Sequence, residues 1–118
     1  MPTTDIIIYH NARCSKSRAT LKLLRERGIE PRIVEYLKEP PDEDELSRVL
    51  GMLGMAPHDL IRTGEDAYQE HDVAGKKSKP RELIRAMIDH PILIERPIVI
   101  SGNKARIGRP PECVLEIL

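Results

Sequence analysis

Cys14 is the residue best placed for chemistry, because it follows a short apolar segment and precedes a run of good helix formers. A cysteine at a helix start faces unpaired backbone N–H groups and the positive end of the helix dipole, and both stabilise a thiolate. The nearby cations Arg13, Lys16 and Arg18 are expected to hold its pKa well below the free value of about 8.5. The same features favour an anion beside the sulfur. We therefore predict a nucleophilic thiolate with an adjacent anion site, the alternative being a small cysteine that serves only packing.

The spacing around this cysteine is Cys-x-x-Ser, because Ser17 stands where a thioredoxin-like site has its second cysteine. An adduct formed at Cys14 must then be resolved by another thiol. The hydroxyl of Ser17 is expected to donate a hydrogen bond to the thiolate, and His10 could do the same if it is protonated. The alternative for His10 is a histidine that only caps the backbone at the end of a strand.

Three arginines that are distant in the sequence stand at predicted element boundaries: Arg62, Arg96 and Arg109. Guanidinium groups are suited to oxyanion recognition because they offer paired N–H donors. The residue pattern alone also allows each of them to be a solvated surface charge. Arg96-Pro97 is the exception, because a proline at a strand start that faces a cysteine site is where thioredoxin folds commonly place a cis peptide bond.

Several other chemistries are excluded by motifs that the sequence lacks. A phosphatase-type loop needs an arginine six positions after its cysteine, where Thr20 stands. The glycine fingerprints of nucleotide binding are missing, so we expect no bound cofactor. Lys plus Arg equals Asp plus Glu at 19 each, which removes the positive field that drives nucleic-acid binding. No metal is expected either, because ligand spacing is missing among His10, His58, His71 and His90.

The length of the chain predicts a single domain over residues 1–118. Cysteine usage and the absence of a secretion pattern predict a cytoplasmic protein whose thiols are reduced. The first apolar run, 6–9, is too short to span a membrane and has no signal-peptide pattern around it. Cys14 and Cys113 are separated by almost the whole chain and do not form the disulfide framework of small secreted domains. We interpret Cys113 as a packing residue.

The segment that must position Cys14 is a strand–helix–strand unit. The β-branched run 5–9 predicts a buried central strand, and 15–27 predicts a helix that ends at Gly28. Residues 31–36 predict a second strand, so the unit forms a right-handed parallel crossover.

The remainder predicts helices, a hairpin and a last helix. In chain order we first expect a helix that begins in the proline-rich acidic segment 40–45 and continues through Leu53, followed by short helical turns within 57–72 and a polar mobile loop over 70–79. A helix from Pro80 to His90 comes next. Strands 97–101 and 104–109 then form a hairpin joined at Gly102-Asn103, and a helix runs from Pro110 to Leu118. The predicted fold class is α/β: a thioredoxin-like mixed sheet, β-α-β then β-β-α, with a helical insertion between the two halves.

Three separated segments of this sequence resemble the glutaredoxin-coupled arsenate reductase family: 10–18 (HNARCSKSR), 90–99 (HPILIERPIV) and 108–112 (GRPPE). The segments match in order and at the expected distances, and the resemblance extends from the first strand to the last residue. It is to the short arsenate-reductase-like branch. The resemblance implies that the cysteine thiolate attacks arsenate, that glutathione adds to the arsenic adduct as co-substrate, and that glutaredoxin reduces it so that arsenite leaves.

The resemblance also implies a role for individual residues. The catalytic residues would be Cys14, His10 and Ser17. The substrate-binding residues would be Arg62, Arg96, Arg109 and Arg18, of which the last also acts on the thiolate. The family usually has proline where Ala12 stands, so we expect a less stiff loop before the cysteine.

Two other functions stay open from the residues. Cys-x-x-Ser also suits a monothiol oxidoreductase that acts on glutathione mixed disulfides and is indifferent to arsenate. A thioredoxin-fold redox regulator that binds a protein partner would keep its function without Arg62, Arg96 and Arg109.

Overall fold

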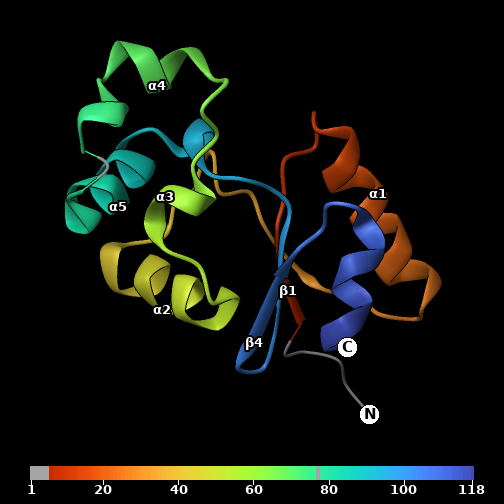
Figure 1. Ribbon diagram of the computed structural model, residues 1–118. Coiled ribbons are helices and arrows are strands. Elements are labelled where there is room, and N and C mark those ends of the chain that lie inside the picture. Colours follow the sequence, from red (N-terminus) through yellow and green to blue (C-terminus); the bar gives the residue numbers. More distant parts are fainter. Residues whose placement is uncertain (1–5, 77) are drawn as a thin grey trace. The chain divides into compact units, whose positions relative to one another are not determined.

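The computed structural model describes residues 6–76 and 78–118 (Figure 1). The chain divides into two compact units. The sheet unit comprises the described residues up to Glu39 together with Arg96–Leu118, and the helical unit comprises Pro40–Glu95. The expectation of one domain over residues 1–118 stays a prediction.

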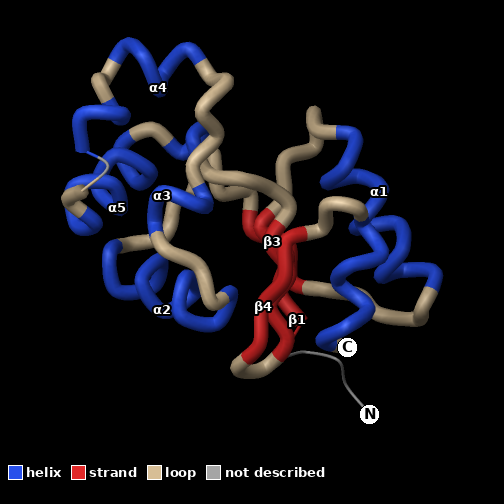
Figure 2. The backbone as a smooth tube through the Cα atoms, in the orientation of Figure 1, coloured by secondary structure: helices blue, strands red, loops and turns tan. Residues whose placement is uncertain are grey.

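The sheet unit is built on four strands in the order β2-β1-β3-β4. Figure 2 shows β1, β3 and β4 in red at the centre of the view. The strands are β1 (Ile6–Tyr9), β2 (Arg32–Val34), β3 (Ile98–Ser101) and β4 (Lys104–Ile107). β1 pairs with β2 in parallel and with β3 antiparallel, and β3 pairs antiparallel with β4. The β-α-β start and the hairpin are therefore confirmed, although β2 is shorter than predicted and residue 5 lies outside the described residues. The carboxyl end of β1 meets the carboxyl end of β2 and the start of β3.

One face of this sheet packs against α1 (Ser15–Glu26) and the terminal 3-10 helix η3 (Pro111–Ile117) (Figure 1). The core cluster between them consists of Ile6, Ile8, Leu21, Leu24, Val99 and Val114. Each fully buried aliphatic side chain of this kind contributes about 1.5–3 kcal/mol. α1 ends as predicted, because Gly28 adopts a φ of +76° that other residues disfavour. The buried leucines thus fix the position of α1, and with it the position of the residue that begins the helix.

The helical unit contains α2 (Glu43–Leu53), α3 (Pro57–Leu60), α4 (Asp66–Glu70), η1 (Val73–Lys76), α5 (Pro80–Asp89) and η2 (Pro91–Leu93). Asp42 caps α2 by accepting a hydrogen bond at Oδ1 from the Glu45 amide over 2.8 Å. The predicted helices are confirmed. The segment 70–79, predicted as a polar mobile loop, contains the 3-10 helix η1 over 73–76, in which the apolar Val73 is buried. Its mobility stays a prediction. Lys77 lies outside the described residues.

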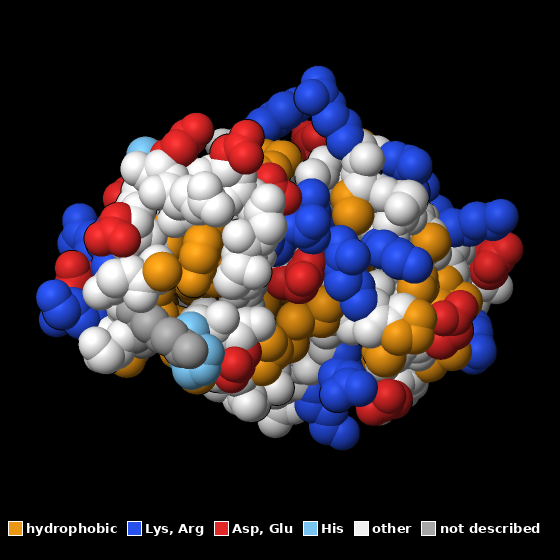
Figure 3. Space-filling view, turned by 45° about the horizontal axis from the view of Figure 1, so that its top comes forward, with side chains coloured by type: hydrophobic (Ala, Val, Ile, Leu, Met, Phe, Trp, Pro, Cys, Tyr) orange, Lys and Arg blue, Asp and Glu red, His pale blue; other side chains and the backbone are white. Residues whose placement is uncertain are grey.

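The surface carries both charge signs. Figure 3 shows Lys and Arg side chains interspersed with Asp and Glu on the visible face, in keeping with the balanced composition. Within residues 6–76 and 78–118, no helix is long and apolar enough to cross a membrane.

Candidate functional site

Cys14 is the N-cap residue of α1, at the carboxyl end of the central strand. Its backbone is extended, with φ −93° and ψ 124°, and its side chain is half-buried. The loop before it is closed by a 2.9 Å hydrogen bond from the Cys14 amide to the Asn11 carbonyl. The Cys14 carbonyl accepts the first helical bond, 3.0 Å from the Arg18 amide. The sulfur therefore lies at the N-terminus of α1, where the sequence placed it.

The pKa of Cys14 is lower than usual for a thiol. Burial acts in the opposite direction and raises it, but the backbone N–H groups of Ser17 and Lys16 and the side chain of Arg96 together outweigh burial. No side-chain capping hydrogen bond forms at this position, so we regard the helix amides as dipoles directed at the sulfur.

The guanidinium group of Arg96 acts on the Cys14 thiol. The side chains of Arg13, Lys16 and Arg18 are exposed, and the guanidinium that lowers the pKa of Cys14 belongs to Arg96. A contribution from the charges of the neighbours in sequence stays a prediction. Solvent screens an exposed cation, whereas Arg96 is only 8% exposed and acts at close range.

The hairpin brings two of the predicted arginines to the sulfur. Ile98 at the start of β3 pairs both with Ile107 at the end of β4 and with Tyr9 at the end of β1. The segments just before β3 and just after β4, which carry Arg96 and Arg109, therefore meet beside the end of β1. Arg109 donates from Nη2 to the Cys14 Sγ at 3.5 Å and from Nε to the Arg96 carbonyl at 2.7 Å. The cis peptide bond predicted at Arg96-Pro97 is confirmed, and Arg109-Pro110 is also cis. Two guanidinium groups thus act on one thiol.

Gly108 is a residue that the sequence reasoning missed. Its amide donates to the Pro97 carbonyl over 2.9 Å. A Cβ atom at this position would lie 2.5 Å from Oγ1 of Thr20 and 2.9 Å from Cγ of Pro97. Only glycine therefore lets α1, the Arg96-Pro97 segment and the end of β4 approach this closely. Its place directly before Arg109 was the signal available in the sequence.

His10 and Ser17 form a buried pair next to Cys14. The Nδ1 of His10 lies 2.6 Å from Oγ of Ser17, which also accepts a hydrogen bond from the Asn11 amide at 3.0 Å. The hydroxyl of Ser17 thus bonds with His10 and the loop backbone, while the Ser17 group that lowers the pKa of Cys14 is its amide. We had expected the hydroxyl to act on the thiolate.

Burial lowers the pKa of His10, and Glu35 opposes this shift by favouring the cation. A neutral His10 can accept the hydroxyl proton of Ser17, because that hydroxyl oxygen already accepts from the Asn11 amide. The protonated His10 considered from sequence is disfavoured. Asn11, which sequence reasoning also missed, further accepts at Oδ1 from the Arg13 amide over 3.0 Å and so shapes the loop that carries the cysteine.

Arg18 makes a different contact. Its Nη1 donates to the carbonyl of Ala12 over 2.9 Å, so the side chain ties the first turn of α1 to the loop before Cys14. This bond restrains the loop at the position where the related family usually has proline. Substrate binding by Arg18 stays a prediction.

Arg62 belongs to the helical unit. Its Nε donates to Glu65 at 3.1 Å and its Nη1 to Glu95 at 2.8 Å, all three side chains being about one-quarter exposed. Burial would lower the pKa of Arg62, but the carboxylates of Glu95 and Glu65 raise it above its ordinary value. This arginine is therefore held between two carboxylates, and its proposed contact with an oxyanion stays a prediction.

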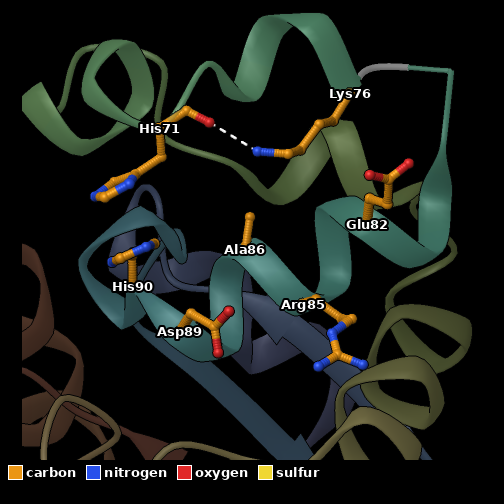
Figure 4. Close-up of a pocket in the computed structure, with 7 residues that line it drawn as sticks. All are labelled: His71, Lys76, Glu82, Arg85, Ala86, Asp89 and His90. Carbon is orange, nitrogen blue, oxygen red and sulfur yellow. Dashed lines mark hydrogen bonds between the residues drawn. The ribbon is translucent and has the colours of Figure 1, made fainter.

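The helical unit also contains a polar pocket of about 280 Å³ (Figure 4). The imidazoles of His71 and His90 stack there, with ring centroids 3.6 Å apart. The other lining residues are Lys76, Glu82, Arg85, Ala86 and Asp89. Among the described residues, no group of three or more His, Cys, Asp or Glu is placed to hold a metal ion. Both cysteines of the chain, Cys14 and Cys113, belong to the sheet unit.

The second thiol, Cys113, lies in η3 and is half-buried. Its sulfur donates to the Arg109 carbonyl at 3.7 Å. This contact is in keeping with a packing residue that also supports the backbone of Arg109.

Comparison with known proteins gives consistent matches over almost the whole chain. The family model described as ArsC family matches residues 9–117. The chain is 52% identical over 117 residues to the Escherichia coli K12 protein called uncharacterized protein YfgD, with 98% of each chain covered. It is 45% identical over 115 residues to an arsenate reductase of Neisseria meningitidis serogroup A, with 97% of this chain and 98% of that one covered.

The solved structures give the same result. An arsenate reductase from Vibrio cholerae is 44% identical, covers both chains completely and superposes with a TM-score of 0.95. The likeness and the observed strand order confirm the predicted thioredoxin-like α/β fold class.

Proposed function

This chain belongs to the ArsC family, and from that premise we propose that it reduces arsenate to arsenite through the Cys14 thiolate, with glutathione and glutaredoxin as electron donors. The observation that carries the proposal is the 3.5 Å contact between Nη2 of Arg109 and Sγ of Cys14. It brings a guanidinium, a type of group suited to oxyanion recognition, beside a sulfur whose pKa is lowered. The names of the related reductases support arsenate as the oxyanion.

The first step uses the thiolate as nucleophile. Sγ of Cys14 bonds to arsenic(V), and one arsenate oxygen leaves as water after protonation. Arg109 and Arg96 favour this step because their charges stabilise the anionic substrate and the charge that develops on its oxygens. The amides at the start of α1 add further donors to the same place.

The later steps need two external thiols, because Ser17 stands where a second cysteine would be. Glutathione displaces a second oxygen from arsenic and forms a sulfur–arsenic bond, with release of water. A glutaredoxin thiolate then attacks the glutathione sulfur, and the broken sulfur–arsenic bond leaves its electron pair on arsenic, which becomes arsenic(III). Hydrolysis of the bond to Cys14 releases arsenite and restores the thiol.

The His10–Ser17 pair positions the loop in this mechanism. A neutral His10 accepts from the Ser17 hydroxyl, and the Ser17 oxygen in turn accepts from the Asn11 amide. Because the Asn11 carbonyl accepts from the Cys14 amide, the three residues fix the orientation in which the sulfur faces the arginines. We assign His10 and Ser17 as positioning residues for the thiolate.

A second candidate function is a monothiol oxidoreductase that acts on glutathione mixed disulfides. The low pKa of Cys14 favours it as well, because attack on a disulfide also needs a thiolate. It gives no role to the convergence of Arg96 and Arg109 on the sulfur, and this is why we rank it second.

The test is arsenate-dependent NADPH consumption in the presence of glutathione, glutathione reductase and glutaredoxin. We expect an arsenate-dependent rate with the natural chain and none with Cys14→Ser, while the matched control Cys113→Ser retains the rate. No rate above background with the natural chain would remove the proposal. Turnover of a glutathionylated peptide at a rate unaffected by arsenate would establish the second candidate instead.

A further inference from the structure

A cavity of about 300 Å³ in the sheet unit lies against the loop that leads to Cys14. Its two walls come from separate segments. One wall is the loop His10, Asn11, Ala12 and Arg13, and the other is formed by Glu35, Leu37 and Lys38. The first wall ends at the residue directly before the nucleophile. The volume is at the lower end of the range for small-molecule sites.

The sheet order explains why this cavity is separate from the arginines. β1 lies between β2 and β3, and the loop after β1 is joined to the end of β2 by a 2.9 Å bond from the His10 amide to the Val34 carbonyl. Glu35, Leu37 and Lys38 follow β2 directly, so the cavity lies on the β2 side of the loop. Arg96 and Arg109 reach the sulfur from the β3–β4 side.

The lining carries charges of both signs together with an apolar side chain. Arg13 and Lys38 are exposed cations, and Glu35 faces Lys38 across 3.8 Å. Leu37 is 39% exposed although it is a large apolar residue. An oxyanion needs only cations, and Glu35 would repel it. A molecule that combines carboxylates, an ammonium group and a short aliphatic chain matches this lining better.

We propose that this cavity binds the peptide body of glutathione and so delivers the co-substrate thiol to the adduct on Cys14. The inference rests on the proposed function, because it names the place where that reaction takes its first external thiol. Lys38 and Arg13 bind the carboxylates of the tripeptide, Glu35 binds its ammonium group, and Leu37 contacts the methylene carbons. Electrophile and thiol then approach Cys14 from opposite sides of β1.

The direct test is binding of S-methylglutathione, which has the charged body of glutathione and no reactive thiol. We expect saturable binding by calorimetry, and a Kd about five- to tenfold weaker for Lys38→Met because one charge-assisted contact is lost. The matched control is Lys22→Met, an exposed lysine on α1 outside the cavity. Lys38 is preferred to Glu35 for this test because Glu35 also acts on the pKa of His10.

A second measurement distinguishes failure of the cavity from failure of arsenate reduction. The thiolate of Cys14 attacks glutathione disulfide, forming a mixed disulfide and releasing one glutathione thiolate, and this exchange needs no arsenate. We expect Lys38→Met to slow exchange with glutathione disulfide about fivefold and to leave exchange with neutral bis(2-hydroxyethyl) disulfide unchanged.

Equal Kd values for the natural chain, Lys38→Met and Lys22→Met would overturn the inference even if arsenate were reduced. The inference would also be overturned if Lys38→Met changed the KM for glutaredoxin and nothing else. Lys38 would then contact the glutaredoxin protein and not glutathione. Weakened S-methylglutathione binding in a chain that does not reduce arsenate would leave the cavity assigned and remove the proposed function.

Discussion

Arg109 in the sheet unit and Arg62 in the helical unit are both half-buried arginines, and their guanidinium groups have different partners. Arg109 donates to a backbone carbonyl and to the Cys14 sulfur. Arg62 donates to the carboxylates of Glu65 and Glu95. Two carboxylates together exceed the charge of one guanidinium at Arg62, whereas at Arg109 one of the contacts is with a sulfur that can itself become the anion.

The comparison shows that residue type and placement at an element boundary do not decide what an arginine does. The contacts of Arg109 favour a negative group at the sulfur, namely the thiolate or an oxyanion. An oxyanion that binds Arg62 must instead compete with carboxylates already in place. The two sites therefore predict different responses to substitution.

The largest expected effect is that of Arg109→Leu. Removing one donor that stabilises developing charge costs about 10²- to 10³-fold in kcat, and we expect a loss of this size in the arsenate-dependent rate. The pKa of Cys14 should also rise, measured as thiolate absorbance in the ultraviolet against pH. The matched control Arg106→Leu, which removes a surface arginine paired with Glu116, should change neither quantity. A rate within about threefold of the natural chain would show that Arg109 only packs against the sulfur.

Gly108→Ala tests whether close packing holds Arg109 in place. The added Cβ meets Thr20 at 2.5 Å and Pro97 at 2.9 Å, so we expect a loss of about 1–3 kcal/mol in the free energy of unfolding. The pKa of Cys14 should rise in the same variant, because the arginine next to the glycine is displaced. Urea unfolding and thiolate absorbance measure the two effects.

The double variant Gly108→Ala/Thr20→Ala sharpens this test, because it removes Oγ1 and Cγ2 of Thr20, two of the three atoms nearest the new Cβ. We expect it to recover part of the lost stability and to bring the pKa of Cys14 back down. Gly64→Ala is the control, since nothing lies within 4 Å of a Cβ there, and its effect should stay within about 0.5 kcal/mol. Recovery of stability without recovery of the thiol pKa would mean that Gly108 acts on packing alone.

In the helical unit the expected effects are smaller. Arg62→Leu leaves two neighbouring carboxylates without their shared cation, and we expect a loss of about 1–2 kcal/mol in stability. Glu95→Gln removes one competitor for the guanidinium. If Arg62 binds the oxyanion as proposed, the KM for arsenate should fall about two- to fivefold with kcat unchanged. An unchanged KM in both variants would restrict Arg62 to a structural role.

Local patterns in the sequence were sufficient for most of the fold. The apolar run at β1, Gly28 after α1 and Gly102-Asn103 in the hairpin each act within a few residues, so they could be interpreted without coordinates. The segment 70–79 could not, because the burial of Val73 depends on tertiary packing. In the same way, η3 could be predicted as helical, but not as a 3-10 helix.

The candidate site was only partly predictable for the same reason. The place of Cys14 at a helix start is local and was anticipated. That Arg96 supplies the charge on its sulfur is not local, because it depends on the register between β3 and β4. The sequence predicted that the Ser17 hydroxyl would act on the thiolate, whereas the Ser17 amide lowers the pKa of Cys14 and the hydroxyl bonds with His10. This difference depends on the direction of one side chain, which residue spacing does not give.

The smallest effect we expect is a pH dependence of stability that originates at His10. Burial lowers the pKa of this histidine in the folded state, whereas in the unfolded chain it titrates near about 6.5. Between these two values the unfolded chain binds more protons, so the free energy of unfolding must decrease as the pH falls through this window and level off below the folded pKa.

His10→Gln removes this contribution while retaining a side chain that can hydrogen-bond to Ser17. We therefore expect the stability of the natural chain relative to His10→Gln to be greatest near pH 7.5 and to decrease at pH 5.5, as measured by urea unfolding. His58→Gln, at an exposed histidine of the helical unit, controls for the loss of an imidazole. Because a protonated His10 can no longer accept the Ser17 hydroxyl proton, the arsenate-dependent rate of the folded chain should fall only as the pH drops through the lowered pKa of folded His10, below the window in which the stability changes. A stability difference that is equal at both pH values would mean that the pKa of His10 is the same in the folded and unfolded chains. A difference that grows as the pH falls would mean that folding favours the protonated imidazole, and the pair would then have to be reassigned with His10 as the donor.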